Sequence, residues 1–102
     1  MSAKTPRNVT FSEIWEFRFE EIISTNVRKF ISMSGYTTQE ISYKTNLSVA
    51  TINRLKNGKG FSVKAICSLA EAVDRFPEEF LLPPEHLKNS LYGINLFEEP
   101  LD

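Results

Sequence analysis

The sequence predicts a small all-α protein with one domain, and three observations lead to that prediction. Apolar residues recur at helical spacing over residues 14–31, and shorter stretches with the same periodicity follow. Residues that favour the start or the end of a helix separate these stretches. The chain of 102 residues is 41% apolar and 25% charged, which suits a globular domain with one modest core.

The first predicted helix begins at Ser12 and continues to Met33. Acidic residues in its first turn favour its start, and Gly35 is suited to its end. The pattern fits either one long helix or two helices separated near residues 24–26.

A short second helix is predicted over residues 38–45. Thr37 and Glu40 have the spacing of a capping box, in which each residue satisfies a backbone N–H of the other. Asn46 follows at a position where a tight turn needs a positive φ, which Asn tolerates better than most residues.

Three more helices are predicted after this turn, which makes five. Ser48 is a suitable N-cap for a helix over residues 49–56, which an Asn-Gly pair ends. A further helix is expected over residues 62–73, and Pro77 fits the first turn of a short helix over residues 77–81.

Charge is distributed unevenly along the chain, although the total is only −1. Residues 41–70 contain no acidic residue and have five basic ones, Lys44, Arg54, Lys56, Lys59 and Lys64. Residues 71–102 have eight acidic and two basic residues, a net charge of −6. Phosphate binding depends on charges within a Debye length, about 8–10 Å, so the basic segment is suited to nucleic acid. The alternative is an ordinary solvated surface.

Residues 38–56 have the organisation of a helix-turn-helix, whose second helix enters the major groove of DNA. Apolar residues occur where the two helices must face each other and the core, at Ile41, Leu47, Ile52 and Leu55. With the capped first helix, the Asn46 turn, the Ser-initiated second helix and the terminal Asn-Gly, residues 36–82 resemble the lambda-repressor/Cro-like (Xre) family.

This resemblance implies a five-helix lambda-repressor-like domain over residues 20–82. Residues 1–19 would form an N-terminal extension that is partly helical, and residues 83–102 an acidic C-terminal tail.

The resemblance also implies which residues contact DNA. Ser48 would open the recognition helix, whose groove-facing residues would be Val49, Ala50, Asn53 and Arg54. The other expected contacts, mostly to phosphates, are Thr38, Gln39, Lys44, Lys56, Asn57 and Lys59. Val49 and Ala50 can only touch a thymine methyl, so base recognition would depend on Asn53 and Arg54, which suit adenine and guanine.

The expected function is sequence-specific binding of double-stranded DNA by a homodimer that regulates transcription, as a repressor at an operator. One alternative is a protein-interaction module that modulates a phage-type repressor, and another is the antitoxin of a toxin–antitoxin pair. A protein partner would bind the aromatic segment with Trp15, Phe17 and Phe19, or the acidic tail.

Other classes of function are not expected. No apolar stretch approaches the roughly 20 residues of a membrane span, and the N-terminus does not have the pattern of a signal peptide, which favours the cytoplasm. With one cysteine (Cys67) and one histidine (His86), we expect no disulfide, metal, cofactor or enzymatic activity. Cys67 is expected to be buried in the core.

Overall fold

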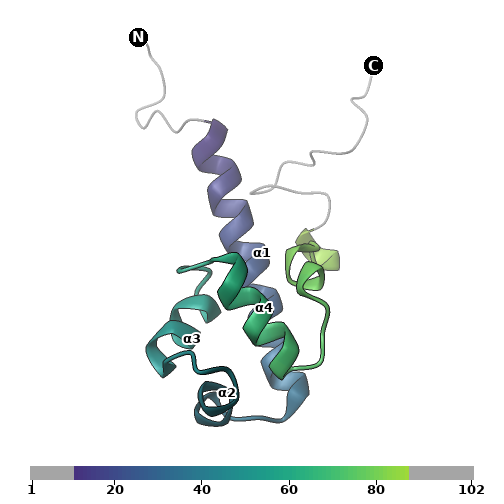
Figure 1. Ribbon diagram of the computed structural model, residues 1–102. Coiled ribbons are helices and arrows are strands. Elements are labelled where there is room, and N and C mark those ends of the chain that lie inside the picture. The colour runs from purple at the N-terminus through teal and green to yellow at the C-terminus, as the bar shows by residue number, and fades with distance from the viewer. Residues whose placement is uncertain (1–10, 88–102) are drawn as a thin grey trace, which may run out of the picture.

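The computed structural model describes residues 11–87, and these form only helices (Figure 1). The four α-helices are α1 (Phe11–Ser34), α2 (Thr38–Thr45), α3 (Val49–Lys56) and α4 (Val63–Ala72). Two short 3-10 helices follow, η1 (Pro77–Leu81) and η2 (Glu85–Leu87). The all-α prediction is therefore confirmed for the described residues. The start of the N-terminal extension and most of the acidic tail lie outside them.

Helix α1 is one continuous helix rather than two. The polar residues near its middle do not break it, because their side chains bind other parts of the molecule. Ser24 Oγ donates to the Lys56 carbonyl at 2.7 Å, and Asn26 Nδ2 donates to the carbonyls of Phe80 and Leu82. Figure 1 shows the amino-terminal half of α1 extending beyond the body that the other helices form.

The prediction of five α-helices is wrong for the described residues, because the segment Pro77–Leu81 is a 3-10 helix. Phe76 before it and Leu82 after it are both extended, and the residue before a proline, such as Leu82, disfavours the α conformation. The five residues between them are too few for a stable α-helix, and 3-10 geometry is common in such short segments.

The local signals around α2 and α3 are confirmed. Thr37 Oγ1 accepts from the Glu40 N–H at 3.1 Å, while Glu40 Oε1 accepts from the Thr37 N–H at 2.8 Å. Asn46 ends α2 with a φ of 66°. Ser48 caps α3 by accepting from the Thr51 N–H. These contacts fix where both helices begin and how the chain turns between them.

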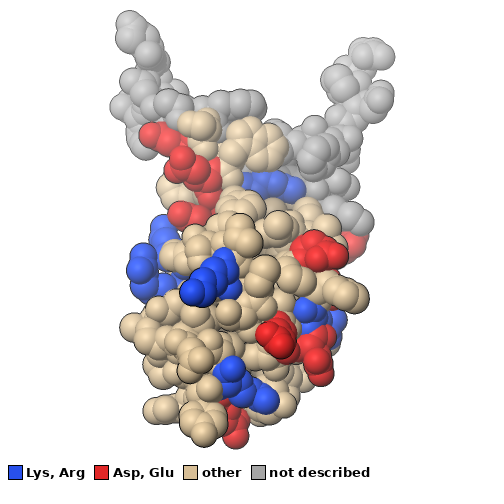
Figure 2. Space-filling view, in the orientation of Figure 1, with Lys and Arg blue, Asp and Glu red and all other residues tan. Residues whose placement is uncertain are grey.

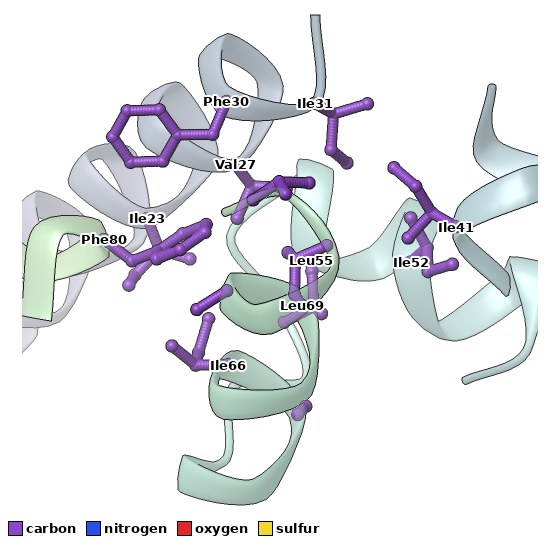
Figure 3. Close-up of a cluster of buried hydrophobic side chains, with 13 residues drawn as sticks. Ile23, Val27, Phe30, Ile31, Ile41, Ile52, Leu55, Ile66, Leu69 and Phe80 are labelled. Carbon is purple, nitrogen blue, oxygen red and sulfur yellow. The ribbon is translucent and has the colours of Figure 1, made fainter. Parts of the chain in front are cut away.

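The core lies between α1 and the shorter helices (Figure 3). The apolar residues expected inside the helix pair are there: Ile41, Ile52 and Leu55 are fully buried, and Leu47 packs against them. On the other side of the core, the rings of Phe30 and Phe80 meet edge to face at 4.9 Å between centroids. One core therefore fixes α2 and α3 on α1.

No helix among residues 11–87 combines the length and the apolar character that crossing a membrane requires.

Candidate nucleic-acid interface

Helix α3 presents a polar face to the outside of the molecule. Ile52 and Leu55 are fully buried and fix the rotation of the helix about its axis. Ala50, Asn53 and Arg54 are consequently exposed, as the sequence predicts for residues that would meet base edges. Val49, also expected to face the groove, is half-buried.

Helices α2 and α3 are connected by polar contacts as well as by apolar packing. Lys56 Nζ donates to Thr38 Oγ1 at 2.7 Å, so two expected phosphate contacts bind each other. Ser42 Oγ donates to the Leu47 carbonyl at 2.6 Å across the turn. The small Ser42 side chain thus satisfies a backbone group where the helices approach each other.

The carboxyl end of α3 is held by Arg28, a residue that sequence reasoning missed. Its Nε donates to the Lys56 carbonyl at 2.7 Å, and its guanidinium NH2 donates to Asn57 Oδ1 at 2.8 Å. A cation at this end of a helix is favourable, because the last carbonyls have no partner within the helix. Nothing near Arg28 in the sequence signals this role, because its partners lie 28 and 29 residues away.

Lys59 lies in the loop between α3 and α4 and binds α1. Its Nζ forms an ion pair with Glu20 Oε1 at 2.9 Å, and both side chains remain partly exposed. Gly58, next to it, is buried with a φ of 76° and lies so close to the Glu20 carbonyl that a Cβ would overlap it. The loop is therefore fixed against α1.

The other expected contacts on α2 and at the turn are exposed. Gln39 and Lys44 lie on the outer surface of α2, and Lys44 Nζ is 4.7 Å from the centre of the Tyr36 ring. The Ser48 hydroxyl caps α3 and donates to Thr51 Oγ1 at 2.9 Å.

A positively charged hollow of about 530 Å³ is lined by residues of α3, of the turn before it and of α4. Arg54 and Lys64 line it together with hydroxyl groups such as those of Thr51 and Ser62. Its lining includes no acidic side chain among the described residues. Two cations in one hollow favour the approach of an anion such as phosphate.

Cys67 is exposed, so the expectation that it lies in the core is wrong. The core face of α4 is formed by Ile66, Leu69 and their neighbours, and Cys67 is rotated by about 100° from Ile66 on the helix. Among residues 11–87, no group of three His, Cys, Asp or Glu side chains could hold a metal ion.

Comparison of the chain with family models, with curated proteins and with solved structures found no match.

Proposed function

We propose that the protein binds double-stranded DNA with α3 in the major groove and regulates transcription as a lambda-repressor-like, Xre-type regulator. One observation carries the proposal: the exposed face of α3 presents Asn53 and Arg54, while the opposite face is fully buried. A reading helix must hold its side chains in a fixed orientation, because base edges discriminate through hydrogen-bond geometry.

The distribution of charge supports the proposal. The segment from Ile41 to Ala70, which includes α3 and the last five residues of α2, contains no acidic residue. Figure 2 shows acidic side chains gathered over the amino-terminal half of α1 with basic ones next to them, and side chains of both signs on the part of the surface formed by the shorter helices. A phosphate backbone would therefore be attracted to the face with α3 despite the net charge of −1.

We further propose that the DNA-bound form is a homodimer that represses transcription at an operator. One recognition helix covers only a few base pairs, and dimers of this motif class bind half-sites about 34 Å apart. A dimer seated on an operator would exclude the transcription machinery from the same DNA.

The test is a titration of the protein against the intergenic DNA upstream of its own gene, at several salt concentrations. An unrelated duplex of equal length is the control. We expect selective binding to the upstream DNA, with the logarithm of the affinity falling linearly with the logarithm of the salt concentration. Equal binding to both duplexes, or no binding near physiological salt, would contradict the proposal.

Arg54→Ala tests the reading role of α3 directly. We expect a loss of about 1–3 kcal/mol in specific binding and an unchanged melting temperature, because Arg54 is exposed. Lys29→Ala is the matched control. Lys29 is also an exposed cation, but it lies on α1 beside the Phe30 ring and not on α3. Equal affinity and base preference in the Arg54 variant and the native protein would remove Arg54 from the readout.

A protein-interaction module is the second candidate, and specific observations favour it. Val49 and Ala50 have no hydrogen-bonding side chains, while Lys56, Asn57 and Lys59 already bind groups within the protein. These features leave few polar side chains for bases or phosphates. Absence of DNA binding, with a repressor bound in a pull-down by the purified proteins, would support this candidate.

A further inference from the structure

We propose that a second copy of this chain docks in the groove between the amino-terminal half of α1 and the loop joining α3 to α4. The proposal rests on the proposed function, whose dimer it supplies with an interface. The groove has a volume of about 810 Å³, and its apolar part is lined by Trp15, Phe19, Ile22 and Phe61.

The groove is built on a fixed contact between α1 and the loop. The rings of Phe19 and Phe61 meet edge to face at 5.3 Å between centroids. The close approach of Gly58 to the Glu20 backbone brings the loop to this distance. Yet Phe19 remains 39% exposed and Phe61 37%, so this apolar wall is left partly in contact with solvent. Aromatic side chains of this kind dominate the energy of protein interfaces.

The two edges of the groove have opposite charge. Glu16 and Glu20 line it from α1 together with the largely buried Arg18, and Arg54 and Lys59 line it from the end of α3 and the loop. In Figure 2 acidic side chains likewise gather over the amino-terminal half of α1, with basic ones next to them. A two-fold interface brings the same patch of both copies together, so the patch must complement itself. A patch with an acidic edge, an apolar centre and a basic edge meets this requirement.

The shape of the molecule favours a second copy over an unrelated partner. The same half of α1 that forms one wall of the groove also projects from the body (Figure 1). When two copies are related by a two-fold axis, the projecting half of each α1 can lie along the groove of the other. Its acidic side, which includes Glu13, then faces the basic edge with Lys59.

The docked arrangement leaves part of the proposed reading surface accessible. Ala50 and Asn53 do not line the groove, whereas Arg54 and Lys59 form its basic edge. A dimer formed here can therefore present both α3 helices to DNA.

Sedimentation velocity and Trp15 fluorescence of the full chain without DNA test the proposal. Trp15 is the only tryptophan and lines the groove, so its emission reports on what happens there. We expect a monomer–dimer equilibrium, with the emission maximum moving to shorter wavelength over the same concentration range in which the sedimentation coefficient rises.

Phe61→Asp is expected to weaken self-association at least tenfold, because it puts a charge in the apolar centre. Phe76→Asp is the matched control, since Phe76 is 70% exposed next to η1 and does not line the groove. Glu16→Lys changes only the acidic edge and is expected to weaken association about threefold. Circular dichroism must show native helix content in each variant.

A chain that stays monomeric with constant Trp15 emission would overturn the proposal. So would a dimer that Phe76→Asp disrupts and the two groove variants leave intact. Because DNA is absent, these outcomes are independent of the proposed function. A dimer that does not bind its upstream DNA would refute DNA binding alone. A monomer that binds a half-site would refute this interface and the proposed dimer, but not DNA binding.

Discussion

At the scale of single residues, Gly58 shows how one position fixes the loop after α3. Its φ of 76° lies in the left-handed region, where residues with a Cβ are strained. A Cβ there would also overlap the Glu20 carbonyl, which belongs to the backbone of α1 and cannot easily move. Both effects disfavour every other amino acid at this position.

We therefore expect Gly58→Ala to lower the free energy of unfolding by about 2–4 kcal/mol, as large steric effects do. Gly35→Ala is the matched control, because Gly35 has a similar φ of 78° but no atom within 4 Å of its would-be Cβ. That variant should lose only about 1 kcal/mol. Urea denaturation measures both values. Equal losses of unfolding free energy in the two variants would show that the contact between Gly58 and α1 does not contribute to stability.

Residue roles could be predicted from the sequence where both partners are close along the chain. Thr37 and Glu40 are three residues apart, and Ser48 caps a backbone N–H three residues away. Arg28 and Asn26 bind groups 28 to 56 residues away, so no local pattern could identify them. The same limit applies to the hydrogen bond from Lys56 to Thr38, which joins residues 18 positions apart.

At the scale of elements, η1 is attached to α1 by one buried polar side chain. Asn26 is 3% exposed, and its Nδ2 donates to the carbonyls of Phe80 and Leu82 at 2.8 and 2.9 Å. These two hydrogen bonds hold η1 where Phe80 fills the core.

Asn26→Leu should lower the free energy of unfolding by about 1–3 kcal/mol, because it leaves the buried Phe80 carbonyl and the partly buried Leu82 carbonyl without this donor. Glu21→Leu, on the exposed surface of the same helix, should change stability by no more than about 0.5 kcal/mol. Thermal unfolding followed by circular dichroism compares the two. If both variants were equally stable, the attachment of η1 would depend on apolar packing alone.

The sequence predicted the elements well where capping residues and apolar spacing agree, as in α2, α3 and α4. It did not decide whether α1 is continuous, because Ser24 and Asn26 favour helix ends locally but have tertiary partners. It predicted the place of η1 but not its 3-10 geometry, which follows from the small number of residues between Phe76 and Leu82.

At the scale of the whole molecule, the distribution of charge over the surface matters more for binding than the net charge does. The face with α3 is formed by a segment without acidic residues, whereas the groove joins that segment to the acidic half of α1. The sequence could reveal the basic segment, because the charged residues in each part of the chain can be counted directly. It could not reveal the groove, which requires Phe19 and Phe61 to meet from positions far apart in the chain.

The ion pair between Lys59 and Glu20 links the two proposed surfaces. Both side chains are partly exposed, at 55% and 34%, so the pair contributes at most about 1 kcal/mol and a phosphate can compete for the lysine. If Lys59 contacts a phosphate, its removal reduces by about one the number of counterions released on binding.

We accordingly expect Lys59→Gln to lower the slope of log affinity against log salt by about 0.9, and Glu20→Gln to strengthen binding at low salt. The gain from Glu20→Gln should become smaller as salt rises, because salt also screens the attraction between the Glu20 carboxylate and Lys59 in the native protein. Titrations of both variants against the upstream duplex at four or more salt concentrations give the slopes. If Lys59→Gln has the same slope of log affinity against log salt as the native protein, Lys59 remains paired with Glu20 in the DNA complex. The loop would then contribute to the dimer groove and not to DNA binding.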